Sequence, residues 1–308
     1  MEYDVIIVGA GPAGLSAGLY AARSKLNTLL FEKTVIGGQI NTTLEIENYP
    51  GSENNITGPE LVDKMKEQCL SFGAKVAMEN VIKIEKKDNL FNITTNKNTY
   101  SSKSCILATG SHSKELGIQG EEEFKGMGVS YCATCDGFFY TNKEVVVIGG
   151  GDTALKEAIY LTKFAKKVSV IHRRDEFRAN RSLVDRAKSN AKIEFILSSE
   201  VLKINGKDTV KSVTIKDKKE DKIYDLAIDG VFMFVGFIPN SKEFEDLVSL
   251  DENGYVNTNS YLESETKGLF VAGDVRHKTL RQVITAASDG AICAFQAEEY
   301  INENFKEN

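Results

Sequence analysis

Two glycine-rich turns, about 140 residues apart, constrain the fold of this chain more than any other feature of its sequence. They read Gly9-Ala10-Gly11-Pro12-Ala13-Gly14 and Gly149-Gly150-Gly151-Asp152-Thr153-Ala154. Each turn follows a short run rich in Val and Ile, and each precedes a stretch with helical spacing and then a second short apolar run. Strand, turn, helix and strand in this order form a βαβ unit. The sequence therefore predicts an α/β fold with two Rossmann-like nucleotide-binding domains.

The first glycine turn has the features of a dinucleotide site. Gly9 permits the tight turn, Gly11 lets the backbone approach a pyrophosphate, and Gly14 lets the helix pack closely on the strand. The helix predicted for residues 12–24 points free N–H groups at the phosphates. Glu32 ends the next strand, where a carboxylate can bind the diol of an unmodified ribose, as in FAD. The candidate FAD-binding residues of this unit are Gly9, Gly11, Pro12, Ala13, Gly14 and Glu32.

In the second βαβ unit, basic residues occupy the position that corresponds to Glu32 in the first unit. The strand after the turn ends in His172-Arg173-Arg174, and Arg178 follows one helical turn later. A ribose 2′-phosphate requires cations there, and a guanidinium group binds phosphate through a fixed fork of donors. This pattern predicts an NADPH site; the alternative is a solvated basic start to a helix. The candidate residues are Gly149, Gly151, Asp152, Thr153, Ala154, His172, Arg173, Arg174 and Arg178, with Asp152 also expected to cap a helix over residues 152–165.

The rest of the chain predicts further strands around these two units. Apolar runs that end in Thr109-Gly110 and in Gly273-Asp274 are expected to be strands. Residues 209–236 alternate in polarity and predict an antiparallel meander that leads into a buried strand. The stretch from Leu280 is rich in Ala and predicts a long helix with a fraying polar tail.

The pair Cys132 and Cys135, in YCATCDGFFY, admits three interpretations. A structural zinc site needs four ligands, but the chain has no second C-x-x-C and its three histidines are scattered, so no metal is expected. An inert buried pair is the second interpretation, because free cysteine packs as a small hydrophobe. The third, a redox disulfide, is favoured because C-x-x-C thiols often have lowered pKa values. Asp136 can give or take the proton that dithiol chemistry requires, or it can cap a turn.

Composition and charge exclude several classes of protein. The net charge of −6 argues against general nucleic-acid binding. No apolar run reaches the roughly 18 residues of a membrane span, and no signal peptide is expected because a strand pattern begins at once. An odd number of cysteines does not suit a secreted disulfide framework, so a cytoplasmic protein is expected. Cys69, Cys105 and Cys293 lie in apolar patterns and are expected to be structural.

These motifs together resemble one family along nearly the whole chain. The resemblance is to the low-molecular-weight, bacterial-type thioredoxin reductases, which are FAD- and NADPH-dependent pyridine nucleotide-disulfide oxidoreductases. It rests on the stretches GAGPAG, GGQINTTLEIENYPG, ILATGS, YCATCDGFFY, GGGDTA, HRRDEFRA, GLFVAGDV and RQVITAASDG. The block C-A-T-C-D-G is the most specific of them.

The resemblance implies a domain organisation and an electron path. The FAD domain is expected to be discontinuous, with residues 1–114 and 245–308, and the NADPH domain, residues 115–244, is inserted and carries the cysteines. Electrons are expected to pass from NADPH to FAD, then to Cys135, while Cys132 attacks the disulfide of thioredoxin and Asp136 acts as the acid. Family members are homodimers and rotate one domain against the other. The resemblance adds Gly38, Gln39, Asn48, Thr109, Gly110, Asp274, Arg281 and Gln282 as candidate flavin-site residues.

Alternatives remain open at this point. Family members usually have two acids after the second glycine turn, whereas this chain has Lys156 before Glu157, which bears on the choice of electron donor. A related flavoenzyme could use ferredoxin or NADH, or could reduce another small disulfide protein. A peroxidase-type reductase would need an additional N-terminal dithiol domain. A non-enzymatic nucleotide sensor would have no use for the C-x-x-C pair.

Overall fold

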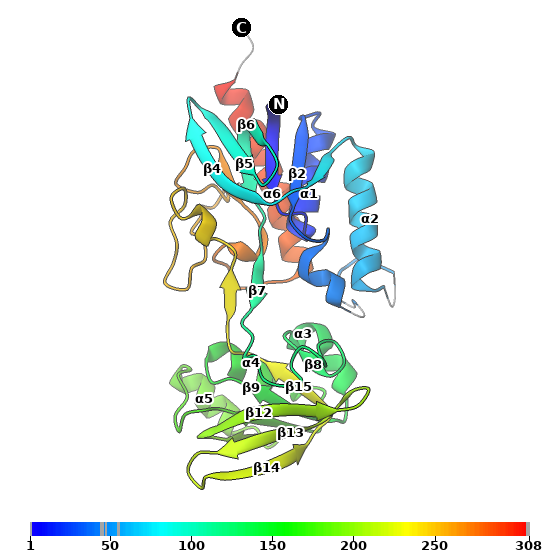
Figure 1. The fold of residues 1–308 in the computed structure, drawn as a ribbon, viewed down its shortest axis with the longest axis vertical. Helices are drawn as coiled ribbons and strands as arrows, with labels where there is room; N and C mark the ends of the chain where they lie inside the picture. Colours follow the sequence, from blue (N-terminus) through cyan, green and yellow to red (C-terminus); the bar gives the residue numbers. More distant parts are fainter. Residues whose placement is uncertain (1, 44–45, 47, 54–55, 306–308) are drawn as a thin grey trace. The chain divides into compact units, whose positions relative to one another are not determined.

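The computed structural model describes residues 2–43, 46, 48–53 and 56–305 and divides into two compact units (Figure 1). The first unit comprises Met1–His112 and Ile238–Asn308, and the second comprises Ser113–Phe237. The predicted boundaries fall two residues later at the first crossing and seven residues later at the second. The chain thus forms part of one unit, completes the other, and returns to the first.

A mostly parallel sheet forms the centre of the first unit. Its order is β3-β2-β1-β6-β5-β4, and β17 also pairs with β6. Strand β6 is long enough to pair with β5 along its first half and with β17 along its second. The strands are β1 (Glu2–Val8), β2 (Thr28–Glu32), β3 (Lys75–Met78), β4 (Val81–Lys87), β5 (Leu90–Thr95), β6 (Thr99–Leu107) and β17 (Leu269–Val271).

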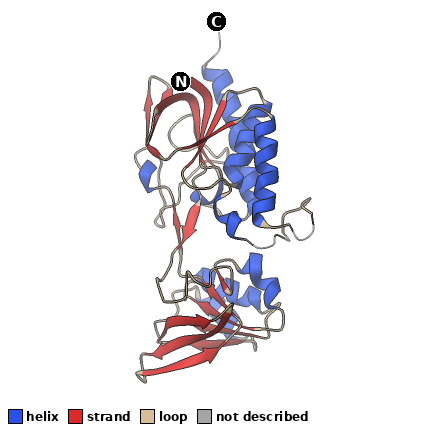
Figure 2. Cartoon of the chain, turned by 45° about the vertical axis from the view of Figure 1, so that its right-hand side comes forward, coloured by secondary structure: helices blue, strands red, loops and turns tan. Residues whose placement is uncertain are grey.

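Three helices cover one face of this sheet, and Figure 2 shows them side by side. They are α1 (Pro12–Arg23), α2 (Gly58–Ser71) and α6 (Val283–Asn304). Because side chains alternate along a strand, Val5 and Ile7 of β1 pack under the helices, whereas Ile6 and Val8 enter a second core on the opposite face. Helices α1 and α6 approach so closely that a Cβ on Gly290 would lie 2.1 Å from the carbonyl oxygen of Ala13.

The second unit has three layers. A parallel sheet of order β11-β10-β9-β15-β8 lies between helices on one face and the antiparallel sheet β12-β13-β14 on the other. The strands are β8 (Val129–Ser130), β9 (Glu144–Ile148), β10 (Lys167–Ile171), β11 (Ile193–Ile196), β12 (Ser199–Gly206), β13 (Val210–Asp217), β14 (Lys222–Ala227) and β15 (Gly230–Met233). The helices are α3 (Ala133–Asp136), α4 (Asp152–Leu161) and α5 (Arg181–Lys188).

The structure confirms both predicted βαβ units, the meander and the long C-terminal helix. The long C-terminal helix begins at Val283, three residues after the predicted start, and α4 differs from the prediction at both ends. Helix α4 ends at Leu161, four residues before the predicted end, and Gly151 rather than Asp152 is its N-cap. The Asp152 carboxylate instead accepts a hydrogen bond from the backbone N–H of Asn180, at 2.7 Å. The end of the predicted fraying tail, residues 306–308, lies outside the described residues.

Short strands join the two units where the chain crosses between them. Strand β7 (Ser111–Ser113) pairs with β16 (Phe237–Pro239) in a two-stranded sheet. None of the helices in the described part of the chain has the length and apolar character needed to cross a bilayer.

Candidate active site

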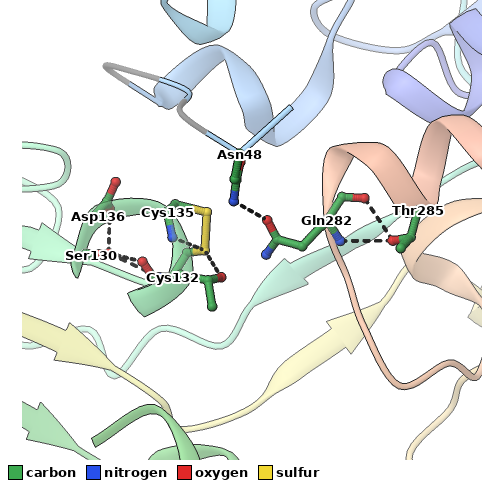
Figure 3. The surroundings of a disulfide bond; sticks show 8 residues. Asn48, Ser130, Cys132, Cys135, Asp136, Gln282 and Thr285 are labelled. Atoms are coloured by element: carbon green, nitrogen blue, oxygen red, sulfur yellow. Dashed lines mark hydrogen bonds between the residues drawn. A yellow bond between two sulfur atoms is a disulfide. The ribbon is translucent and has the colours of Figure 1, made fainter. Parts of the chain in front are cut away.

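Cys132 and Cys135 are joined by a disulfide bond in the second unit (Figure 3). Cys132 is the N-cap of the single-turn helix α3, and its Sγ accepts a hydrogen bond from the backbone N–H of Cys135, at 3.2 Å. One turn of helix brings residues three apart onto the same side, so the Cα atoms lie 5.3 Å apart, within the usual range for a disulfide. Both residues are half-buried, which leaves the pair accessible.

The three other cysteines are free and fully buried. Burial raises the pKa of Cys69 to about 11 and that of Cys105 to about 12, and it raises the pKa of Cys293 further. A thiol attacks as its thiolate, so these three are inert at neutral pH. The structure supports their predicted packing role and leaves the bonded pair as the redox-competent cysteines of the chain.

Asp136, the last residue of α3, is held by Ser130. The Ser130 hydroxyl donates to the Asp136 carboxylate at 2.6 Å and accepts from the backbone N–H of Cys132 at 3.1 Å (Figure 3). Burial raises the pKa of Asp136, and the hydrogen bond from Ser130 opposes that rise. Such a carboxyl can hold a proton more readily than an exposed one can. Ser130 is not predicted from the sequence, where its only signal is its place two residues before Cys132.

Two glycines of the first glycine turn are required by the protein's own backbone, because a side chain at either position would clash with it. Gly9 has φ +106°, and a Cβ there would lie 2.3 Å from the carbonyl oxygen of Ala108. A Cβ on Gly14 would lie 1.9 Å from the carbonyl oxygen of Gly9. At Gly11, in contrast, the one described atom within 4 Å of such a Cβ is the carbonyl oxygen of Gly37, at 3.8 Å. This space fits the close approach of a ligand phosphate.

Glu32 lies beside this turn, as the sequence predicted. It ends β2 and is buried, and its carboxylate accepts hydrogen bonds from the backbone N–H groups of Ala10, at 3.1 Å, and Thr34, at 3.0 Å. A carboxylate in this place can receive the hydroxyl groups of a ribose.

Asp274 Oδ1 and Arg281 Nε are two of the three buried polar atoms of the first unit that lack a hydrogen-bond partner within the part of the chain that the structure describes; the third is Ser111 Oγ. Burial raises the pKa of Asp274, whereas Lys278 and Arg281 act in the opposite direction. The Arg281 guanidinium lies 4.0 Å from the centre of the Tyr255 ring. Buried polar groups are normally hydrogen-bonded, so this pair fits a polar ligand such as the ribityl chain and carbonyls of a flavin.

Asp289 holds the turn that presents Asp274, and sequence reasoning missed it. It is buried in α6 and accepts hydrogen bonds from the backbone N–H of Gly273, at 3.0 Å, and from the side chains of Arg276 and Lys278. An aspartate within the apolar stretch AASDGAICA is the signal that could have found it.

The other predicted flavin-site residues also lie in the first unit. Gly38 and Gln39 begin the 3₁₀ turn η1 (Gly38–Thr42), and the Gln39 amide donates to the carbonyl oxygen of Ser111. The Asn48 amide donates to the side chain of Gln282 at 3.0 Å (Figure 3). The Thr109 hydroxyl is bound to the carbonyl oxygen of Asn240 at 2.7 Å, and Gly110 has φ +69°.

The second glycine turn repeats the pattern of the first. A Cβ on Gly149 would lie 2.4 Å from the carbonyl oxygen of Phe234, whereas no described atom lies within 4 Å of a Cβ placed on Gly151. Gly150, which sequence reasoning did not single out, is required by His172, because a Cβ there would lie 2.2 Å from that ring. His172 is buried and stacks on Phe177, and its Nε2 lacks a partner among the described residues.

The cations predicted beside this turn are exposed. Within the described residues, the guanidinium groups of Arg173, Arg174 and Arg178 form no ion pair, although their charges help burial to lower the pKa of His172. The backbone N–H of Arg178 donates to the carbonyl oxygen of Gly150 at 2.9 Å, which ties this segment to the glycine turn. Unneutralised guanidinium groups beside a nucleotide-type turn fit a phosphate-bearing ligand.

Comparison with known proteins agrees with this geometry. The family model of the pyridine nucleotide-disulphide oxidoreductases matches residues 3–290. A thioredoxin reductase of Peptoclostridium litorale is 45% identical over 99% of this chain and 99% of its own length. A bifunctional thioredoxin reductase/thioredoxin of Mycobacterium leprae is 44% identical over 98% of this chain and 66% of its own. The crystal structure of thioredoxin reductase from Streptococcus pyogenes covers 98% of this chain and 99% of its own, with 44% identity and a TM-score of 0.94.

The chain belongs to the thioredoxin reductases. As a member of this family it is an oxidoreductase that uses a flavin and a pyridine nucleotide. Its two Rossmann-like units and its Cys132–Cys135 disulfide are the parts that this chemistry requires.

The open space at Gly11 gives a test of the flavin site in this thioredoxin reductase. Gly11→Ala is expected to change the free energy of unfolding by less than about 1 kcal/mol, because the new methyl meets no close atom. It is expected to weaken flavin binding by about tenfold or more, because the methyl blocks charge-assisted hydrogen bonds from the backbone to phosphate. Thermal unfolding and flavin titration by fluorescence quenching measure the two effects.

The contrast is Gly14→Ala, whose methyl would lie 1.9 Å from a backbone oxygen and is expected to prevent folding of the first unit. Unchanged flavin affinity in Gly11→Ala would show that the pyrophosphate does not approach this turn.

Proposed function

We propose that the chain reduces the disulfide of oxidised thioredoxin with electrons from NADPH, which reach the Cys132–Cys135 pair through FAD. The observation that carries this proposal is the half-buried disulfide, with a half-buried carboxyl beside it whose pKa burial raises, and inert cysteines elsewhere. In balance, NADPH, a proton and one thioredoxin disulfide give NADP⁺ and one thioredoxin dithiol.

Each residue at the disulfide has a distinct task in this proposal. Bound FAD supplies the transfer of an electron pair from the pyridine nucleotide to the disulfide. Cys135 receives the pair at its sulfur, which frees Cys132 as the attacking thiol. Asp136, whose pKa burial raises, keeps a proton available and gives it to a departing thiolate. The helical N-cap position of Cys132 favours its thiolate, because the backbone N–H of Cys135 already points at its sulfur.

The preference for NADPH rests on the three exposed arginines. Three positive charges lie just after the end of β10, on Arg173, Arg174 and Arg178. Guanidinium groups bind the 2′-phosphate of NADPH, and an unmodified ribose has no anionic group for them to bind. The preference for FAD rests on Glu32, whose carboxylate suits the diol of the adenosine ribose. The proposed FAD domain is the discontinuous unit and the proposed NADPH domain is the inserted one. The proposed FAD domain contains the Gly9–Gly14 turn, Glu32, Gly38, Gln39, Asn48, Thr109, Gly110, Asp274, Arg281 and Gln282. The proposed NADPH domain contains the Gly149–Ala154 turn and the cluster of His172, Arg173, Arg174 and Arg178.

The choice of thioredoxin as the acceptor is supported by the similar proteins reported above, which are thioredoxin reductases. The Mycobacterium leprae protein joins thioredoxin reductase and thioredoxin in one polypeptide, and this chain matches 66% of that length. We also propose a homodimer, as the family resemblance implies, and a cytoplasmic location, as the odd number of cysteines suggests. Lys156 is exposed on α4, so its charge can act on the donor without disturbing the core.

Anaerobic reduction of the purified yellow protein tests the proposal. NADPH is expected to bleach the flavin rapidly, and oxidised thioredoxin is expected to restore its colour. Parallel reactions contain NADH or reduced ferredoxin instead. Faster bleaching by either of these would overturn the choice of donor and leave the disulfide assignment in place, whereas a flavin that thioredoxin does not reoxidise would show that another disulfide protein is the acceptor.

A further inference from the structure

Ser130 is placed to act on both ends of the redox helix. It is 5% exposed at the end of β8, and its Oγ lies 2.6 Å from Asp136 Oδ2 and 3.1 Å from the backbone nitrogen of Cys132. A third contact, to the carbonyl oxygen of Cys132, is 3.3 Å long. A hydroxyl has one hydrogen to donate, and the shortest contact gives it to the carboxylate. The Cys132 N–H then donates to a lone pair of the same oxygen (Figure 3).

The sheet, not the disulfide, fixes Ser130. Strand β8 pairs with β15 in register, with Ser130 opposite Phe232 and Val129 opposite Val231. Cys132 is the N-cap of α3 and Asp136 is its last residue, so one side chain on the sheet ties down the whole helix. These hydrogen bonds do not involve the sulfur atoms. They can therefore hold Asp136 beside the cysteines in the dithiol form, when the S–S bond no longer does so.

The hydroxyl also acts on the charge of Asp136. Burial favours the neutral carboxyl, whereas a donor aimed at the carboxylate favours its ionised form. On the elements packed against α3, η2 (Gly137–Tyr140) and α4, the titratable and charged groups are Tyr140, Asp152, Lys156, Glu157 and Tyr160. Burial raises the pKa of Tyr140 to about 12 and also raises the pKa of Glu157. Tyr140 is thus neutral in the working range, and Ser130 is the group that directly bonds the acid.

We propose that Ser130 is a positioning residue of the redox site: its hydroxyl fixes the Asp136 carboxyl beside the cysteine pair and decides how readily that carboxyl releases its proton. This inference deepens the proposed function and rests on it for the role of Asp136. The Cys132 thiol first loses its proton to water. Its thiolate then attacks one acceptor sulfur and breaks the acceptor S–S bond, and the released thiolate takes the proton of Asp136.

The second half of the exchange restores the acid. The Cys135 thiol gives its proton to Asp136 and attacks the sulfur of Cys132, which reforms the S–S bond. The second acceptor thiolate leaves and takes a proton from water. Two electrons and two protons have then passed from the dithiol to the acceptor.

The test compares Ser130→Ala with Ser169→Ala in the flavin-containing protein. Ser169 is the matched control, because it is a buried serine on strand β10 of the same unit and its hydroxyl also donates to a carboxylate, that of Glu194. Ser130→Ala is expected to slow oxidation of the dithiol by thioredoxin by about tenfold, the effect of losing a hydrogen bond to a charged group. The alkaline limb of the pH–rate profile is expected to move to higher pH, because the carboxyl holds its proton longer. Ser169→Ala is expected to change neither.

A direct titration separates this role from a purely structural one. Carbon-13 NMR of protein labelled at the aspartate carboxyls, with Asp136→Asn to assign the resonance, is expected to show Asp136 titrating at higher pH in Ser130→Ala. The pair Ser130→Thr and Ser130→Val keeps one shape and differs in the hydroxyl, so Thr is expected to retain the native titration and Val to lose it. An Asp136 titration that is the same with and without the hydroxyl would overturn the role of Ser130. The titration needs no acceptor, so failure of the native protein to reduce thioredoxin would overturn the proposed function alone.

Discussion

Replacement of Cys135 by serine is expected to abolish thioredoxin reduction and to leave the flavin bound and reducible by NADPH. The substitution removes the sulfur that closes the disulfide, so the electron pair has no acceptor in the second unit. Loss of a reacting group of this kind lowers turnover by about 10³-fold or more. The candidate flavin-binding residues lie in the first unit and are unaffected. Flavin absorbance, anaerobic bleaching by NADPH and a coupled thioredoxin assay measure the three expectations.

Cys69→Ala is the matched control. Cys69 is a buried free thiol in α2, so its loss is expected to lower stability by about 1 kcal/mol through a small cavity and to leave turnover unchanged. Normal thioredoxin turnover in Cys135→Ser would show that the electrons take another route.

Replacement of Arg173, Arg174 and Arg178 together by glutamine is expected to lower kcat/KM for NADPH by about 100-fold or more. Charge-assisted hydrogen bonds to phosphate contribute about 1.5–3 kcal/mol each, and two such bonds suffice for this effect. The value for NADH is expected to stay the same, because its ribose lacks the phosphate. The KM for NADPH of the native protein is expected to rise with salt, since exposed charges are screened.

The control for this change is Arg186→Gln, which removes one exposed guanidinium from α5 in the same unit. It is expected to leave both values of kcat/KM unchanged. Equal losses for NADPH and NADH in the triple variant would mean that the arginines stabilise the fold or bind another part of the nucleotide.

The features that could be predicted from sequence are those carried by neighbouring residues. A glycine turn, its flanking strand and helix, and a C-x-x-C pair each occupy one short stretch, and local geometry decides their form. Glu32 could be placed because the βαβ unit fixes the distance from turn to second strand end. The limits of helices do not follow from local pattern alone, because tertiary contacts also decide them, as the early end of α4 shows.

The features that were missed depend on residues that meet only in the folded chain. Ser130 reaches Asp136 because a short strand and a single helical turn are packed together. Asp289 is 16 residues from the backbone N–H that it binds at Gly273, on a different element. Gly150 is required by the ring of His172, which lies 22 residues further along, directly after the next strand. No local pattern reports such distances, so these supporting contacts had to come from the structure.

The close packing of α1 against α6 has a consequence for the order of folding during synthesis on the ribosome. The first helix of the chain completes its packing only against the last one, and Gly290 must arrive before the backbone at Ala13 is covered. The inserted unit, Ser113–Phe237, is contiguous and can fold as soon as it has emerged. The N-terminal segment is therefore synthesised first but completes its packing last, because the apolar face of its sheet is fully covered only after α6 has been synthesised.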